Sequence, residues 1–228
     1  MGFGTLFLGY FLFLNFARPE FTDALAAAIM LYALYKLSGI NKNFKFAFIA
    51  SAVFTVFGIF ELGVELYKMF MPYADTSTLY TACAITRHAV TAVLTILALL
   101  GIREVSIEVG LPLHAKKCER LSYATLAVYA FNVLLEASGL GALFSGQVLA
   151  VMAVISILAT LLVIALNLGA IYTAYMQICM PNEQNMERKK SKSSLIESFR
   201  RHEEEKQREY AEYKLEKFKQ KMDKRKKK

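Results

Sequence analysis

The stretch Gln147–Gln177 reads QVLAVMAVISILATLLVIALNLGAIYTAYMQ and contains no Asp, Glu, Lys or Arg. The hydrocarbon core of a bilayer is about 30 Å thick and takes about 20 mostly apolar residues of helix to cross. This stretch is longer than that, so a helix formed by it would tilt in the bilayer or project beyond it. Because lipid offers no hydrogen bonds to an exposed backbone, we expect the stretch to cross as a helix.

Five further apolar segments precede this one, and short polar stretches with Gly, Pro, Lys or Asp separate them. Their bounds are Gly2–Phe16, Phe21–Leu37, Phe46–Met71, Leu79–Leu100 and Leu121–Ala137. The segments are too continuously apolar for the alternating strands of a transmembrane β-barrel. The sequence therefore predicts an all-α, polytopic membrane bundle of six transmembrane helices, in contact with the lipid bilayer. The polar stretch Arg103–Glu119 is predicted to be the linker between the fourth and fifth helices.

Composition agrees with a membrane protein and excludes several other classes. Hydrophobic residues make up 56% of the chain and charged residues 20%, against about 45–50% and about 25% in soluble domains. Three Cys and three His are too few for a zinc ribbon or an iron–sulfur framework. A single histidine, His88, lies inside a predicted span, which excludes a bis-histidine haem site. We expect no cofactor, no resident metal, no catalytic constellation and no enzymatic activity.

Charge divides the chain into two predicted parts, a bundle over residues 1–181 and a basic cytoplasmic helical tail over residues 182–228. From Asn182 onward, 17 Lys and Arg stand against 10 Asp and Glu. The segment Ser194–Glu197 has the form of a capping box, which predicts the start of a helix. The tail is expected to contact anionic lipid or a cytoplasmic protein. We do not expect nucleic-acid binding, because basic charge alone does not indicate it.

Lys and Arg in short loops indicate which side of the membrane each loop faces. The predicted second and fourth loops are basic, and so is the tail; the loop residues are Lys36, Lys42, Lys45, Arg103, Lys116, Lys117 and Arg120. The third and fifth loops contain no Lys or Arg, whereas Arg18 in the first loop does not fit the pattern. The pattern predicts a multi-pass protein of the plasma or inner membrane with both termini in the cytoplasm. In the alternative topology, Gly2–Phe16 re-enters without crossing, which leaves five spans and an outside N-terminus.

Six polar residues inside the predicted spans are the most informative: Glu61, Glu65, Arg87, His88, Asn132 and Glu136. A charge near the centre of the membrane costs about 2.5–3.5 kcal/mol on insertion scales, so such side chains face the bundle interior or water. With helices that alternate in direction and rise about 1.5 Å per residue, all six fall in the outer half of the bundle. We predict that they converge on one polar binding cluster. The alternative is structural, with Glu61–Arg87 and Glu65–Lys68 as ion pairs that specify packing.

The fifth predicted span also carries a stripe of polar residues three and four positions apart, which places them on one helical face. The stripe consists of Ser122, Thr125, Tyr129, Asn132 and Glu136. Ser156, Thr160 and Asn167 share a face of the sixth span, and Thr91 and Thr95 follow His88 on the fourth. Together these residues could wall a polar path across the bundle. The alternative role is interhelical adhesion, which contributes about 0.6 kcal/mol per hydrogen bond on average.

These features leave three classes of function open. The first is transport or sensing of a small solute or ion through the polar cluster in the outer half of the bundle. The alternative is a membrane-anchored interaction or scaffold module whose basic tail recruits a protein partner or anionic lipid, with the cluster only structural. An intramembrane enzyme or a sensor input domain is the third class and the one the sequence favours least.

Overall fold

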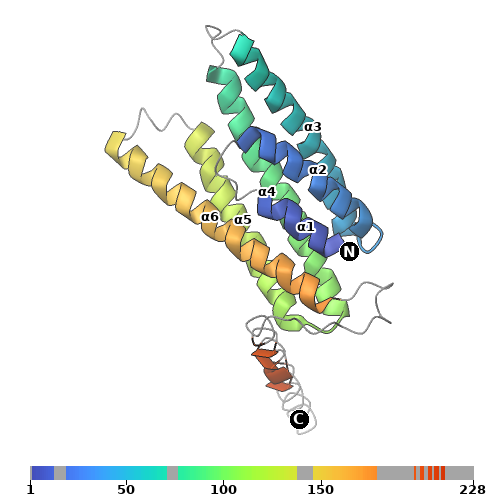
Figure 1. Ribbon diagram of the computed structural model, residues 1–228. Helices are drawn as coiled ribbons and strands as arrows, with labels where there is room; N and C mark the ends of the chain where they lie inside the picture. The colour runs from blue at the N-terminus through green and yellow to red at the C-terminus, as the bar shows by residue number, and fades with distance from the viewer. Residues whose placement is uncertain are drawn as a thin grey trace, which may run out of the picture.

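The computed structural model describes residues 2–12, 19–70, 77–137 and 146–178, together with scattered residues between 198 and 213. For residues 19–23, 65, 68 and 77 it describes the backbone alone. Within these ranges every regular element is a helix, which confirms the all-α prediction. In chain order the helices are α1 (Gly2–Phe11), α2 (Pro19–Leu37), α3 (Lys42–Phe70), α4 (Ser77–Glu108), α5 (Pro112–Ala137) and α6 (Gly146–Gln177) (Figure 1). Most of the predicted tail lies outside the described residues.

Three helices are long and apolar enough to cross a membrane, which supports the prediction of a membrane protein. The candidate spans are Lys42–Val64 in α3, Thr78–Glu108 in α4 and the whole of α6. The apolar parts of α1 and α2 are shorter, at Gly2–Phe11 and Ala24–Leu37. The 10 residues of α1 rise about 15 Å, about half the thickness of the hydrocarbon core.

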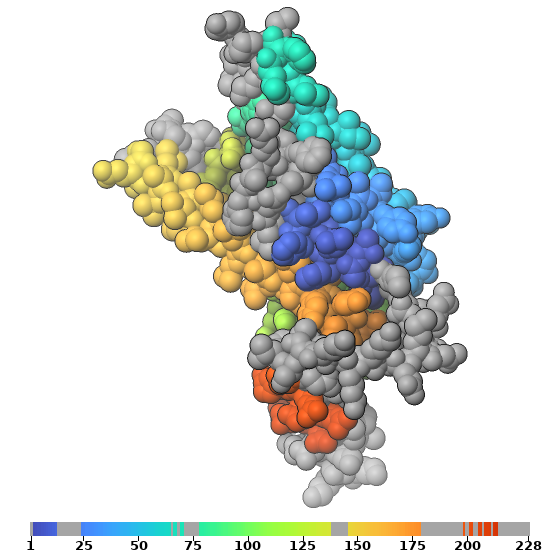
Figure 2. Space-filling view, in the orientation of Figure 1, coloured from blue at the N-terminus to red at the C-terminus, as the bar shows by residue number. Residues whose placement is uncertain are grey.

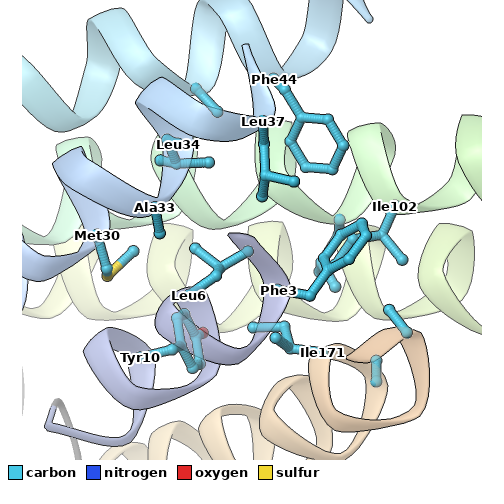
Figure 3. Packing of buried hydrophobic residues seen from close by; sticks show 14 of the residues in the cluster. Phe3, Leu6, Tyr10, Met30, Ala33, Leu34, Leu37, Phe44, Ile102 and Ile171 are labelled. Carbon is cyan, nitrogen blue, oxygen red and sulfur yellow. The ribbon is translucent and has the colours of Figure 1, made fainter. Parts of the chain in front are cut away.

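Buried side chains of α1 fix that short helix between α2 and α6 (Figure 1). Phe3, Leu6 and Tyr10 lie on its inward face and are at most 2% exposed. Figure 3 shows Leu6 and Tyr10 beside Met30 of α2 and Phe3 beside the start of α3. The ring of Phe3 packs edge-on against Phe44, with 5.9 Å between ring centroids. The first residues of α1 and of α3 therefore lie at the same end of the bundle.

The α2–α3 connection is closed by one asparagine. The side-chain oxygen of Asn41 accepts a hydrogen bond of 2.9 Å from the backbone N–H of Phe44, as an N-cap does. Its amide nitrogen donates across to the carbonyl of Gly101 on α4, also at 2.9 Å. Two residues further on, Asn43 donates to the carboxylate of Glu104 at 2.8 Å. These bonds hold the start of α3 against the end of α4.

The predicted linker Arg103–Glu119 is wrong in its extent, because α4 continues to Glu108 and α5 begins at Pro112. The turn between them needs only Gly110, whose φ of 80° is the left-handed conformation typical of a helix C-cap. The N–H of Leu111 donates to the carbonyl of Ser106 at 2.7 Å and completes the cap. Charged residues do not end a helix, so the polarity of this segment was a poor guide to its backbone.

The outside of the bundle is more apolar than a water-soluble surface requires. Along the N-terminal two-thirds of α6, large aliphatic side chains are more than half exposed; they are Val151, Val154, Ile155, Ile157, Leu158 and Leu162. Figure 2 shows this part of α6, in yellow, extending to one side of the molecule. Continuous exposed apolar surface of this kind marks contact with lipid or with another protein.

The close contact between α3 and α4 at Gly101 leaves no room for a larger side chain at this position. A Cβ at Gly101 would lie 2.7 Å from two ring carbons of Phe44, whose side chain is fully buried. We expect Gly101→Ala to lower the free energy of unfolding by about 1–3 kcal/mol through overpacking. Denaturant unfolding in detergent micelles measures the change.

The control is Gly63→Ala on α3, where a Cβ would meet nothing within 4 Å. At that site the substitution should stabilise the helix by up to about 1 kcal/mol through propensity alone. If Gly101→Ala stabilised the protein as Gly63→Ala does, the proposed packing of Phe44 would be wrong.

Candidate functional site

A buried ion pair joins α3 to α4. The Oε1 atom of Glu61 accepts hydrogen bonds from Nη2 of Arg87 at 2.7 Å and from its Nε at 3.0 Å. The Glu61 side chain is 5% exposed and that of Arg87 28%. A carboxylate this deeply buried is retained only when it is paired, so Arg87 is the group that allows Glu61 to stay ionised.

His88 follows Arg87 in the chain but faces a different neighbour. Its ring lies 6.0 Å from that of Tyr129 on α5, measured between centroids, with the planes inclined at 54°. His88 is half-buried, and Tyr129 is 4% exposed. Consecutive residues of α4 thus contact α3 on one side and α5 on the other.

Asn132 of α5 faces α6 rather than the ion pair. Its Nδ2 donates to the Thr160 hydroxyl at 2.9 Å, and the Ser156 hydroxyl donates to its Oδ1. The Thr160 hydroxyl in turn donates to the carbonyl of Ser156 at 2.8 Å. Both ends of the Asn132 amide are therefore bonded, as a polar group in an apolar environment requires.

The direct contacts of the six residues predicted to form one cluster are separate: Glu61 meets Arg87, His88 meets Tyr129, and Asn132 meets α6. His88 nevertheless lies close enough to the charges of Glu136 and Arg87 to interact electrostatically with both. Glu136, in the last turn of α5, is exposed. The side chain of Glu65 lies outside the described part of the chain. Among the residues described, no three His, Cys, Asp or Glu side chains are grouped so as to hold a metal ion.

A second polar network, made of residues of the predicted polar path together with Tyr10, lies deeper in the bundle. The Asn167 amide nitrogen of α6 donates to the Tyr10 hydroxyl of α1 and to the Thr125 hydroxyl of α5, both at 3.0 Å. Thr95 of α4 lies 3.4 Å from the same Tyr10 oxygen. An asparagine in an otherwise apolar helix was a visible signal. Nothing in the sequence indicated that the short first helix would supply its partner.

These contacts form three groups spread over four helices, which together we name the polar seam. Its members lie on α1, α4, α5 and α6 and are Tyr10, His88, Thr95, Thr125, Tyr129, Asn132, Ser156, Thr160 and Asn167. On α5 the polar residues from Ser122 to Asn132 point inward and are buried. The opposite face carries Tyr123, Leu126 and Leu134, each more than half exposed. Helix α5 is therefore polar inside and apolar outside.

His114 and Cys118 form a separate buried pair in the first turns of α5. Nε2 of His114 lies 3.7 Å from the Cys118 sulfur, and His114 is 2% exposed. Burial, together with the Lys117 charge, lowers the pKa of His114 to about 4. Burial raises the pKa of the Cys118 thiol to about 12. Both groups are neutral at pH 7, so the thiol is no activated nucleophile.

Comparison of the chain with protein families, with curated proteins and with solved structures finds no match. Its function is therefore argued from its own residues.

Because Glu61 is more deeply buried than Arg87, we expect substitutions of the two residues to lower the free energy of unfolding by different amounts. Arg87→Met leaves a buried carboxylate without its partner and should lower the free energy of unfolding by about 2–4 kcal/mol. Glu61→Gln leaves the more exposed Arg87 and should cost less. In the double variant the two losses should fall short of their sum, because one interaction is removed twice. Thermal or denaturant unfolding in detergent measures each value.

The control pair is Arg103–Glu119, which is 3.3 Å apart with side chains 35% and 42% exposed. Glu119→Gln should change the free energy of unfolding by less than about 1 kcal/mol, as exposed ion pairs do. Equal losses for Arg87→Met and Glu119→Gln would contradict a buried, specific pair.

Because His114 is buried, we expect the folded protein to lose stability in mild acid. Its pKa is about 4 in the folded state and about 6.5 in an unfolded chain. As pH falls from about 6.5, the unfolded state binds the proton first, so stability is lost down to pH 4 by on the order of 3 kcal/mol. The difference in unfolding free energy between wild type and His114→Asn, measured from pH 8 to pH 4, isolates this contribution. Parallel curves for the two proteins would refute it.

Proposed function

We propose that the chain is a multi-pass protein of the plasma or inner membrane that moves or senses a small polar solute or ion along the polar seam. The observation that carries this proposal is the inversion of α5, which buries Thr125, Tyr129 and Asn132 and exposes Leu126 and Leu134. Polar and ionisable residues inside a membrane bundle are costly and often line a functional site.

The inversion also accounts for how α5 crosses the bilayer. This helix is not among the three long and apolar enough to cross by composition alone. Surrounded by α4 and α6, it presents lipid with apolar side chains and places its polar face against theirs. We therefore count α5 as a span, together with α2, α3, α4 and α6.

We propose that α1 completes the six-helix membrane body from the cytoplasmic side. The Phe3–Phe44 contact supports a common side for the start of α1 and the start of α3. Lys36 and Lys42 flank the α2–α3 turn at that end, and Arg103 and Lys117 flank the α4–α5 turn. Basic residues collected at one end favour a cytoplasmic location for that end. Five crossings from α2 to α6 place the start of α2 on the outside, so we propose that the chain before α2 makes the sixth crossing, which leaves both termini in the cytoplasm.

Adhesion between helices is an incomplete explanation of the seam. Small residues suffice to bring membrane helices together, and an interhelical hydrogen bond adds about 0.6 kcal/mol. The seam instead continues from the Asn132 contacts to the Asn167 contacts, seven residues further along both α5 and α6. A chain of hydroxyl and amide groups along the length of a helix pair can pass a polar solute from one hydrogen bond to the next.

The scaffold alternative depends on the basic charge of residues 182–228. Most of that segment lies outside the described residues, so it remains an alternative that the charge alone supports.

Accessibility of the seam to water tests the proposal. In a background lacking Cys83, Cys118 and Cys179, Asn132→Cys should react with a small, uncharged, water-soluble methanethiosulfonate in proteoliposomes. Leu134→Cys, two residues along the same helix on the exposed apolar face, should not react, because a thiol in lipid is neither hydrated nor ionised. The rate of labelling is the measurement.

A second pair, Thr125→Cys and Leu126→Cys, extends the comparison to the deeper part of α5. If both seam positions are as unreactive as the lipid-facing ones while the proteins remain folded, the seam serves only to pack the helices. In that case the transport or sensing function is wrong.

A further inference from the structure

Asn167 and the three polar side chains around it are the most deeply buried polar group of the seam. Tyr10, Thr95, Thr125 and Asn167 come from four different helices, and none is more than 2% exposed. Figure 3 shows Tyr10 among apolar side chains of the core, with Leu6 and Met30 nearby. A polar atom here has no access to bulk water and depends entirely on local partners.

One end of the Asn167 amide has no partner among the described residues. The nitrogen donates one hydrogen to Tyr10 and the other to Thr125, while the buried Oδ1 accepts no hydrogen bond from the described residues. Exchanging the nitrogen and oxygen positions of the amide does not remove the deficit. The oxygen would then accept from the two hydroxyls, and the NH₂ group would be left with two unused donors.

The Thr125 hydroxyl has a matching deficit. Its one hydrogen bond within the described chain is the one it accepts from Asn167, so its own hydrogen is available to donate. A single molecule that donates to Asn167 Oδ1 and accepts from Thr125 would satisfy both residues. A hydroxyl group has this combination of donor and acceptor.

The surroundings of the cluster favour an uncharged guest. Neither α1 nor α6 contains an Asp, Glu, Lys, Arg or His. On α4 the nearest ionisable residues are His88 and Arg103, seven and eight positions from Thr95, which places them about 10–12 Å away along the axis. On α5, Arg120 is exposed. An ion at Asn167 would lose its hydration with no opposite charge to replace it.

We propose that the Asn167 cluster binds a neutral hydroxyl-bearing molecule, either water or a small polyol, and that the polar seam therefore admits uncharged solutes rather than ions. This inference rests on the proposed function and specifies its substrate class. The Glu61–Arg87 pair is consistent with it, because the pair is internally neutral and offers no net charge to attract a counter-ion.

Binding is tested directly by NMR on protein labelled with ¹⁵N-asparagine in detergent micelles, with Asn167→Leu used to assign the signal. We expect the Asn167 amide protons to show a cross-peak to water, or to glycerol when glycerol is added. Thr125→Val should weaken the cross-peak about fivefold, the effect of one lost hydrogen bond. The control Thr173→Val should leave it unchanged, because the Thr173 hydroxyl bonds to the carbonyl of Gly169 on its own helix.

Permeation is tested by stopped-flow light scattering on proteoliposomes. The wild type should raise osmotic water or glycerol permeability above that of protein-free vesicles, and Asn167→Leu should lower the protein-dependent part at least about fivefold. Flux of water alone identifies water as the guest, and flux of glycerol identifies a polyol. The K⁺ flux should equal that of protein-free vesicles.

The two measurements separate failure of this inference from failure of the proposed function. Absence of a cross-peak to both water and glycerol overturns the binding site, and K⁺ flux through the wild type overturns the preference for uncharged solutes. Solute flux that Asn167→Leu leaves unchanged, in a folded protein, overturns the role of the cluster but retains transport. A cross-peak lost in Thr125→Val without flux of any kind supports the site and overturns transport.

Discussion

The buried polar stripe of α5 has to find its partners inside the protein, and this one constraint organises the structure. Lipid satisfies no hydrogen bonds, and the outward face of α5 consists of side chains such as Leu126 and Leu134. Helices α4 and α6 therefore pack with their own hydroxyl and amide groups toward α5. The short helix α1 is drawn into the same arrangement, because Tyr10 supplies the acceptor for Asn167.

Charged groups and neutral hydrogen-bonding groups lie in different parts of the bundle. The ionised groups meet at the α3–α4 contact, where Arg87 compensates Glu61. The seam between α4, α5 and α6 consists of neutral groups instead, and at the start of α5 burial keeps His114 and Cys118 neutral as well. Under the proposed function this separation favours uncharged solutes, since a low-dielectric interior tolerates a neutral polar guest far better than an isolated charge.

Helix positions could be predicted from the sequence to within a few residues where breakers are strong. The second helix ends at Leu37 as predicted, and the third begins at Lys42, four residues before the predicted Phe46, with Asn41 as its N-cap. The prediction failed where polar residues were taken for the end of a helix. All but three residues of the predicted linker Arg103–Glu119 belong to α4 or α5. The last residues of the predicted first span, 13–16, lie outside the described part of the chain.

By itself the sequence determined the helical class, the apolar lengths, the charge asymmetry and the polar stripe of α5, since each depends on local spacing and composition. The predicted depths placed Glu61 and Arg87 at the same level of the bundle, and the structure pairs them. Depth leaves rotation about the helix axis undetermined, however, and rotation decides which neighbour a side chain meets. Only the tertiary structure turned Asn132 toward Ser156 and Thr160, left Glu136 exposed and brought Tyr10 to Asn167, because those contacts depend on how four helices pack around one another.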